Sequence, residues 1–473
     1  MIVRFLFAAL LVCLPARADS APRPNVVFIL TDNHGAWTLG CYGNRDIRTP
    51  NIDRLASEGT LFTRCYSSNP VCSPTRATYL TGLLPSQHGV HCYLSANEAQ
   101  IGPRAYCTIA EFSNLPRVLA DAGYVCGLSG KWHLGGNERP QVGFTDWLTM
   151  PHGGTSTFYN AEVIVGGKIR KEPTYLTDFW TEHAVQFIEQ NKDRPFFLYL
   201  AYNGPYGLGP LLKRRARNRH ADYYDSLPMK SFPREKMHPW LFNNKEYLNN
   251  VDAMRRYAAE LSGVDDGVGR VLDALRKNSL DERTLVVFTG DQGWIGGQHG
   301  IWGMGDHTRP LTVFDGEMQV PLIYRQPGKI PPGKRSDLLV SNYDFLPTVL
   351  DYVGLQDKTP VKPRLPGHSY APVLRGEPIE SRNAVFFEFE NTRAIRTADW
   401  KYVSRFPNGP DELYHLKADP DERVNLIESE TDAEARNELA RRAEEFFNQY
   451  ADPKYDLRHG GGSKTALLTG AGN

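Results

Sequence analysis

Residues 25–33 read Asn-Val-Val-Phe-Ile-Leu-Thr-Asp-Asn, in which the apolar run 26–30 leads into Thr31 and then into two further polar side chains, Asp32 and Asn33. Residues 285–293 repeat this arrangement as Leu-Val-Val-Phe-Thr-Gly-Asp-Gln-Gly, which brings in Asp291 and Gln292. Similar apolar runs occupy residues 195–202 and 321–324. Continuous apolar runs of this length are typical of strands that are buried on both faces. The sequence therefore predicts a sheet whose strands lie inside the protein.

Helical patterns lie between these strands. The clearest covers residues 254–276, where six apolar side chains recur at three- and four-residue spacing: Leu261, Val264, Val268, Val271, Leu272 and Leu275. Strands that alternate with helices predict an α/β fold, with a large, mostly parallel sheet sandwiched by helices. In such sheets, ligands bind beyond the carboxyl ends of the strands.

The character of the sequence changes after residue 380. Short strand-like runs cover residues 384–390, 392–396 and 401–405, and a helical pattern follows over 432–449. We expect a small C-terminal antiparallel sheet plus helix. The predicted division of the chain is a signal peptide (1–18), a large domain (23–380), a C-terminal subdomain (381–455) and a flexible, glycine-containing tail (456–473).

The N-terminus has the features of a secretory signal peptide. Arg4 precedes an apolar run over residues 5–14, and Ala16-Arg17-Ala18 resembles a cleavage site. We therefore expect a secreted or periplasmic protein. No other apolar stretch reaches the length of a membrane span.

The composition excludes some partners and one type of scaffold. The 54 Lys and Arg residues are balanced by 54 Asp and Glu residues, so no overall charge attracts nucleic acid. The chain has seven cysteines, one of them in the signal peptide, and this is too few for a disulfide scaffold in 473 residues.

The strand ends carry candidate metal ligands. Asp32, Asn33, Asp291 and Gln292 offer carboxylate and amide oxygens at the expected carboxyl ends of two strands. A set of oxygen donors favours a hard cation, calcium before magnesium. The alternative is that these residues only begin turns, which is their commoner use.

Residues 69–82 predict the start of a helix. Ser73 is expected as the N-cap and Pro74 as the first helical residue, so that Cys72 lies just ahead of free backbone N–H groups. Such a position favours a tetrahedral anion. Arg76, one turn into the helix, can reach back toward it. The alternative for Cys72 is an ordinary buried cysteine.

Two motifs carry a resemblance to a known family. Cys72-x-Pro74-x-Arg76, followed by Leu80-Thr81-Gly82, is similar to the signature of the type-I, formylglycine-dependent sulfatases of the alkaline phosphatase superfamily. Residues 123–133, which end in Gly-Lys-Trp-His, resemble the second signature of that family, with Cys126 where Ser or Thr is usual. The resemblance extends over most of the chain and implies a sulfatase catalytic domain over 23–380.

The resemblance implies roles for individual residues. Cys72 would be converted to formylglycine by a maturation enzyme, next to a calcium ion held by the four strand-end residues. Arg76 and Lys131 would stabilise the formylglycine and the sulfate, and His133 would contact a hydroxyl of the formylglycine hydrate. The expected reaction is hydrolysis of a sulfate ester on a small molecule or glycan, with a carbohydrate as the favoured substrate.

Two positions depart from the family pattern. Many sulfatases carry Pro-His after the strand at 195–202, with that His near the leaving oxygen, whereas this chain has Pro205-Tyr206. Tyr206 is the candidate proton donor in its place, although a free tyrosine, with a pKa of about 10, is a weak acid for this task. Met304 replaces the lysine that usually follows the His-Gly-x-Trp-Gly stretch, and His307 or Arg309 are candidates for the missing cation. His299, within that stretch, is expected near the site or as a structural histidine.

Two other functions remain open. A formylglycine-dependent phosphonate or phosphodiester hydrolase would need the same Cys72. A binding protein for sulfated glycans that has lost turnover is favoured by Tyr206 and Met304, but the retained Cys72, Lys131 and His133 argue against it.

Overall fold

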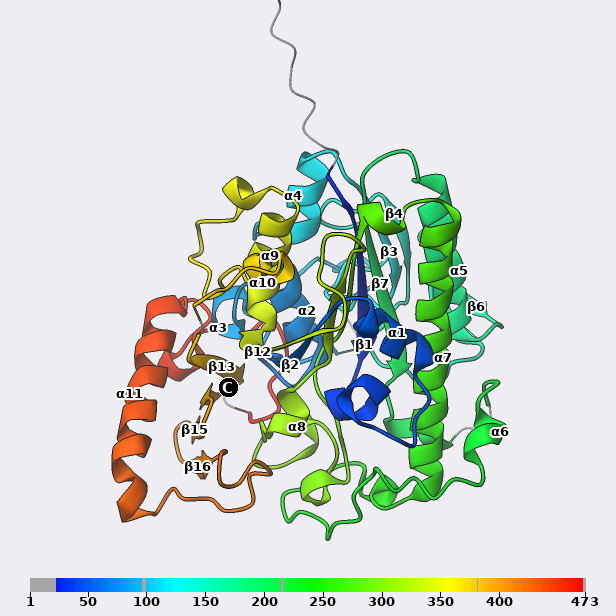
Figure 1. Cartoon of the computed structure of the whole chain (residues 1–473). Coiled ribbons are helices and arrows are strands. Elements are labelled where there is room, and N and C mark those ends of the chain that lie inside the picture. The colour runs from blue at the N-terminus through cyan, green and yellow to red at the C-terminus, as the bar shows by residue number, and fades with distance from the viewer. Residues whose placement is uncertain (1–22, 96–98, 214–216, 381, 471–473) are drawn as a thin grey trace, which may run out of the picture.

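The computed structural model describes residues 23–95, 99–213, 217–380 and 382–470. The predicted signal peptide, residues 1–18, lies outside this part of the chain. A ten-stranded sheet runs through the described chain, with the strand order β12-β2-β11-β8-β1-β7-β3-β4-β5-β6 (Figure 1). Its strands are β1 (Asn25–Asp32), β2 (Thr60–Tyr66), β3 (Val125–Gly130), β4 (Asp146–Thr149), β5 (Ala161–Val165), β6 (Lys168–Glu172), β7 (Phe196–Pro205), β8 (Thr284–Gly290), β11 (Leu322–Arg325) and β12 (Lys334–Ser341).

The centre of the sheet is parallel, as the sequence predicted. Strands β8, β1, β7, β3 and β4 all run in the same direction. Strand β11 is antiparallel to both of its neighbours, β2 and β8. At the edge of the sheet next to β4, strands β5 and β6 form an antiparallel hairpin. Thr31 of β1 pairs with Gly290 of β8, so the residues that follow these two strands emerge side by side.

Helices cover both faces of the sheet because the side chains of the central strands alternate between two cores. Val27 and Ile29 of β1 pack with α1, α5 and α7, whereas Val26 and Phe28 pack with α2, α4, α9 and α10. The two helix layers lie on opposite sides of the strands in Figure 1. The helices are α1 (Pro50–Ser57), α2 (Cys72–Thr81), α3 (Pro85–His88), α4 (Leu115–Asp121), α5 (Leu176–Gln190), α6 (Ala221–Tyr224), α7 (Val251–Lys277), α8 (Asp315–Met318), α9 (Phe345–Tyr352), α10 (Ala371–Leu374) and α11 (Ala433–Tyr450).

The C-terminal region forms a second, antiparallel sheet. Its strands are β13 (Ala384–Phe389), β14 (Thr392–Thr397), β15 (Trp400–Arg405) and β16 (Glu412–His415), and α11 packs across them (Figure 1). Phe386 of β13 stacks on Phe446 of α11 with ring centres 3.6 Å apart. The sequence predicted the first three strands and the helix, but β16 is too short and too polar to stand out as a strand. A two-stranded ribbon, β9 (Ile295–Gly296) and β10 (Trp302–Gly303), lies beyond the main sheet.

The tail was predicted to be flexible over 456–473, but its described part, to residue 470, packs against both the main domain and the C-terminal subdomain. The Lys464 N–H donates to the Gly89 carbonyl at 2.7 Å, and Thr465 Oγ1 accepts from the Cys92 N–H at 3.0 Å. Both carboxylate oxygens of Glu390 accept backbone N–H groups, from Leu468 at 2.6 Å and from Thr469 at 3.0 Å. The composition of the tail gave no sign of these contacts.

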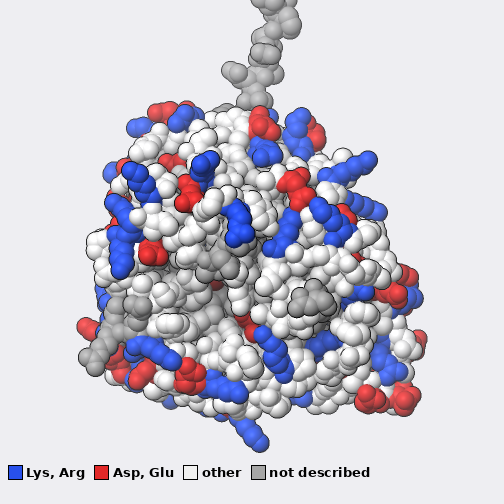
Figure 2. All heavy atoms as spheres, turned by 180° about the vertical axis from the view of Figure 1, so that it is seen from behind, with Lys and Arg blue, Asp and Glu red and all other residues white. Residues whose placement is uncertain are grey.

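The surface carries charges of both signs. Lysine and arginine side chains are interspersed with acidic ones over the face shown in Figure 2, consistent with a formal net charge of zero. Within the described residues, no helix combines the length and the apolar character that a membrane crossing requires.

Candidate active site

Helix α2 begins with Cys72 itself. The N-cap is Val71, whose backbone is extended (φ −135°, ψ 146°) and whose N–H donates to the Asn69 side chain at 2.9 Å. The prediction of Ser73 as the N-cap was wrong, because Ser73 Oγ is used instead as an acceptor by the Leu94 N–H at 3.0 Å. Cys72 therefore lies in the first turn of a buried helix, where unpaired N–H groups and the helix dipole favour negative charge.

Two cations meet two carboxylates next to this helix end. Arg76 Nε and Nη2 donate to Asp291 Oδ2 at 3.0 and 2.8 Å, and its Nη1 donates to the Lys131 carbonyl at 2.5 Å. Lys131 follows β3 directly, and its Nζ lies 2.5 Å from Asp32 Oδ2. All four side chains are fully buried. Because two positive and two negative charges share one dry site, the cluster is electrically balanced.

The predicted metal ligands also converge. Asp291 Oδ1 accepts the backbone N–H groups of Asn33 at 3.2 Å and Gln292 at 2.9 Å, and the Gln292 amide donates to Asn33 Oδ1. Asp32 Oδ1 is buried without a hydrogen-bond partner. Burial, followed by the neighbouring Asp32 carboxylate, raises the pKa of Asp291 to about 6. A buried orphan oxygen beside further oxygen donors is the environment that a hard cation stabilises, so the residues fit calcium.

The Cys72 thiol is unsuited to act as a nucleophile in its unmodified form. Burial raises its pKa to about 12, although Lys131 opposes this effect. At neutral pH an unmodified Cys72 is thus a neutral thiol, and the thiolate is the reactive species.

His133 has one ring nitrogen engaged and one unpaired. Its Nε2 lies 2.9 Å from the Leu94 carbonyl oxygen, which can only accept, so Nε2 carries the proton. Its Nδ1 is buried without a hydrogen-bond partner. Burial lowers the pKa of His133 well below its ordinary value. The neutral ring therefore offers Nδ1 as a proton acceptor.

A cavity of about 800 Å³ opens onto Cys72 and His133. Tyr206 lies in its wall, with its ring centre 5.5 Å from Lys131 Nζ and its backbone N–H on the Asp32 carbonyl at 3.1 Å. Burial raises the pKa of Tyr206 above its ordinary value, so its hydroxyl stays protonated at neutral pH.

The loop that carries Met304 forms another part of the wall. Met304, His307 and Arg309 all line the cavity, so the structure brings both candidate cations to it. His307 Nδ1 accepts from the Met304 N–H at 3.1 Å, which leaves its other ring nitrogen for the cavity. Arg309 donates to two carbonyls of its own loop, those of Asp306 and Thr308. His307 is the better placed of the two for a substrate contact.

His299 is not brought to the site. Its ring stacks on Phe314 with centres 3.9 Å apart, and burial lowers its pKa to about 4. Its charged neighbours include Arg423, Glu235 and Lys401, none of which lines the Cys72 cavity. The geometry therefore favours His299 as a structural histidine.

Many cavity residues escaped the sequence analysis, and three of them are instructive. Asp306 has a buried Oδ1 without a hydrogen-bond partner, and Tyr93 and Leu468 line the cavity from a loop and from the C-terminal tail. Asp306 is next to His307 in sequence and was detectable as a charged neighbour of a candidate. Nothing in the sequence signals that Leu468, almost 400 residues after Cys72, packs against the apolar cluster that contains Cys72.

Comparisons with known proteins show the family of the chain. A family model described as "Sulfatase" matches residues 24–355, and one described as "N-sulphoglucosamine sulphohydrolase, C-terminal" matches residues 300–449. The N-acetylglucosamine-6-O-sulfatase of Bacteroides thetaiotaomicron is 28% identical, over 93% of this chain and 89% of that protein. The N-acetylgalactosamine-6-sulfatase of Canis lupus familiaris is 30% identical, over 81% and 72%.

Solved structures give the same fold. One, described as a complex with its substrate D-glucosamine-2-N,6-O-disulfate, has 26% identity and a TM-score of 0.71, and the match covers 92% of this chain and 99% of that one. The phosphonate monoester hydrolase of Agrobacterium radiobacter shares the fold at 22% identity and a TM-score of 0.69, covering 91% and 97%.

The fold and the site together define a hydrolase of the alkaline phosphatase superfamily. Within that superfamily, the chain belongs to the sulfatase family and is a sulfuric ester hydrolase. The resemblance drawn from the two sequence motifs is thereby confirmed, as is the predicted fold.

Proposed function

We propose that this protein is an exported, calcium-dependent sulfatase that removes sulfate from a carbohydrate through a formylglycine at position 72. The observation that carries the proposal is the position of Cys72, at the buried N-terminus of α2 and at the floor of the cavity. There it lies beside Lys131, Arg76 and His133. A thiol held neutral at that position has no obvious use, whereas an aldehyde at the same carbon can be hydrated to a geminal diol.

The diol supplies both steps of the reaction. One hydroxyl attacks sulfur, the bond from sulfur to the ester oxygen breaks, and the alcohol leaves with a proton. The second hydroxyl then loses its proton, the carbon–oxygen bond to sulfate breaks, and the aldehyde is restored as inorganic sulfate departs. His133 Nδ1 has a free lone pair and is suited to hold the proton of a diol hydroxyl.

The buried cations act on the sulfate itself. Lys131 and Arg76 are held by the two carboxylates, so they are positioned before the substrate arrives. Such preorganised charge stabilises the oxygens on which negative charge develops in the transition state. Asp32, Asn33, Asp291 and Gln292 would hold calcium, which when bound polarises the diol and the sulfuryl oxygens.

The leaving alcohol needs a proton donor. Tyr206 lines the cavity and keeps its proton at neutral pH, but its raised pKa makes it a weak acid for this task. His307 lines the same cavity with one ring nitrogen turned away from its own loop contact. Because Nδ1 accepts the Met304 N–H, the His307 ring is neutral, and its remaining N–H gives up a proton less readily than a phenol does. We therefore assign the donor role to Tyr206 and a positioning role to His307.

The carbohydrate substrate is supported by the relatives. Two of them are described as sulfatases of the 6-position of N-acetylhexosamines, and a structural relative holds a sulfated glucosamine. Sulfate release from N-acetylglucosamine 6-sulfate and N-acetylgalactosamine 6-sulfate, measured by ion chromatography, is the direct test. No release from a panel of sulfated sugars by protein whose position 72 is shown by mass analysis to be an aldehyde would contradict the proposal.

The second candidate is a formylglycine-dependent phosphonate hydrolase, because one relative of the same fold has that description. Turnover of matched aryl sulfate and aryl phosphonate esters separates the two activities. Faster cleavage of the phosphonate ester would favour the second candidate.

A further inference from the structure

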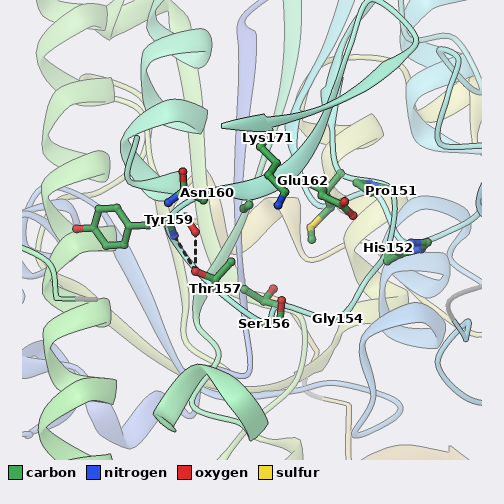
Figure 3. Close-up of a pocket in the computed structure, with 12 residues that line it drawn as sticks. Pro151, His152, Gly154, Ser156, Thr157, Tyr159, Asn160, Glu162 and Lys171 are labelled. Carbon is green, nitrogen blue, oxygen red and sulfur yellow. Dashed lines mark hydrogen bonds between the residues drawn. The ribbon is translucent and has the colours of Figure 1, made fainter. Parts of the chain in front are cut away.

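A second cavity, of about 560 Å³, lies directly beside the Cys72 cavity. The two share the residues Gly154, Thr155 and Ser156, so one short loop separates them. The far side of the second cavity is formed by the edge hairpin β5–β6 (Figure 3). Its volume lies in the range of about 300–1,000 Å³ that is typical of small-molecule sites.

The loop between the cavities is held rigidly by buried amides. Asn137 Nδ2 donates to the carbonyls of Met150 at 3.0 Å and Pro151 at 3.1 Å. Asn203 Nδ2 donates to Thr155 Oγ1 at 2.8 Å. These bonds come from side chains that are themselves buried, so the wall is preformed.

The far end of the same loop closes on itself. Thr157 Oγ1 donates to the Tyr159 carbonyl at 2.7 Å and accepts the Tyr159 N–H at 3.1 Å, as the dashed lines in Figure 3 show. This turn orients the loop so that the side chains of Ser156 and Thr157 reach the second cavity.

The far side of the second cavity carries one positive and one negative side chain. Glu162 of β5 and Lys171 of β6 are direct cross-strand partners, and both side chains extend into the cavity (Figure 3). Both are exposed, and no ion pair engages either of them with another described residue. The Ser156 hydroxyl and the remaining lone pair of Thr157 Oγ1 add a donor and acceptors around this balanced pair of charges.

We propose that this cavity binds the sugar unit next to the sulfated one, so that the enzyme prefers an oligosaccharide to a monosaccharide. The inference rests on the proposed function and adds a second binding site to it. A polar lining with one ammonium and one carboxylate matches the vicinal hydroxyls of a sugar ring, which donate and accept at once. The shared loop puts this site next to the cavity that receives the sulfate.

The proposal is tested with Lys171→Ala, assayed on a 6-sulfated N-acetylhexosamine and on an oligosaccharide that contains the same sulfated unit. Lys168→Ala is the matched control, since Lys168 is also an exposed lysine of β6 but does not line the cavity. Loss of one hydrogen bond to a charged group weakens the binding of a ligand by about tenfold. We expect Lys171→Ala to lower kcat/KM about tenfold for the oligosaccharide and to leave the monosaccharide and the control within about twofold.

Equal losses on both substrates, or none on the oligosaccharide, would overturn the second site. If the wild type releases no sulfate from either compound, the proposed function fails. The second sugar site is then tested by binding of the oligosaccharide alone. In that case the affinity for the oligosaccharide is measured by titration calorimetry. A Kd that rises about tenfold in Lys171→Ala supports the site, and an unchanged Kd refutes it.

Discussion

At the scale of single residues, Cys72 lies at a position where a thiolate is hard to form. Cys72 is buried, and its thiol has a pKa of about 12. We expect Cys72→Ala, and wild-type protein made without the maturation enzyme, to be folded and inactive. Circular dichroism checks the fold, sulfate release checks the activity, and mass analysis of the Cys72 peptide checks the aldehyde. Turnover by protein that retains the thiol would contradict the mechanism.

Gly153 supports His133 in a way that only the folded structure reveals. A Cβ atom on Gly153 would lie 2.0 Å from His133 Nε2, so Gly153→Ala must displace the imidazole from the Leu94 carbonyl. We expect turnover to fall by about 10² or more, since a positioned acid–base group contributes at least that much. If Gly153→Ala lowers turnover only by displacing His133, the double variant Gly153→Ala/His133→Ala has the same turnover as His133→Ala alone. Additive losses would contradict this route.

The residues of the site differ in how far sequence could predict them. Asp32 and Asp291 were predictable because neighbouring parallel strands end at one edge of a sheet. Lys131 and His133 came from a motif. Asp306 and Leu468 were missed because they reach the cavity through loop and tail packing, which has no local pattern.

At the scale of elements, the tail is the clearest case of structure beyond the sequence pattern. Glu390 binds the backbone of Leu468 and Thr469, and this fixes the Leu468 side chain in the wall of the Cys72 cavity. We expect Leu468→Ala to raise the KM for a sulfated sugar by up to about tenfold, since the lost apolar contact is worth on the order of 1–2 kcal/mol. The expected change in kcat is small.

The control for the tail is Leu467→Ala, which removes the same side chain one position earlier and outside the cavity lining. Steady-state kinetics of both variants give KM and kcat separately. Equal kinetic effects of the two substitutions would show that the tail acts only through general stability.

Helix α8 carries a buried carboxyl that predicts a pH dependence of stability. Glu317 is fully buried and accepts from Thr312 Oγ1 at 2.7 Å and from the Phe314 N–H at 2.8 Å. Burial raises its pKa to about 8. Between the unfolded pKa near 4.5 and this value, the folded state holds a proton that the unfolded state lacks. The free energy of unfolding contributed by this group therefore falls as the pH rises from about 4.5 to 8.

Glu317→Gln removes this titration and keeps the shape of the side chain. We expect its unfolding free energy to fall less than that of the wild type between about pH 5 and pH 8, by about 1–3 kcal/mol. Urea unfolding at several pH values measures the difference. Parallel profiles for the two proteins would show that Glu317 is ionised in the folded state.

At the scale of the whole molecule, the charge balance of the site predicts coupling between metal and product. Asp32 and Asp291 neutralise Arg76 and Lys131, so the buried cluster is neutral before any ligand binds. A divalent cation adds two positive charges to this dry site, and a sulfate dianion cancels them. Each ligand therefore lowers the cost of burying the other, and the coupling is reciprocal.

We expect calcium to raise the Tm of metal-free protein, and calcium with sulfate to raise it by more than the sum of the two separate shifts. A ligand at one hundred times its Kd stabilises the folded state by about 2.7 kcal/mol, which a thermal melt resolves readily. Chloride at equal ionic strength controls for screening. Asp32→Asn removes one acidic ligand, together with the carboxylate partner of Lys131, so its calcium shift is predicted to be reduced. Strictly additive Tm shifts would mean that calcium and sulfate bind independently of each other. The charge balance of the four buried side chains would then stabilise the fold without coupling the two ligands.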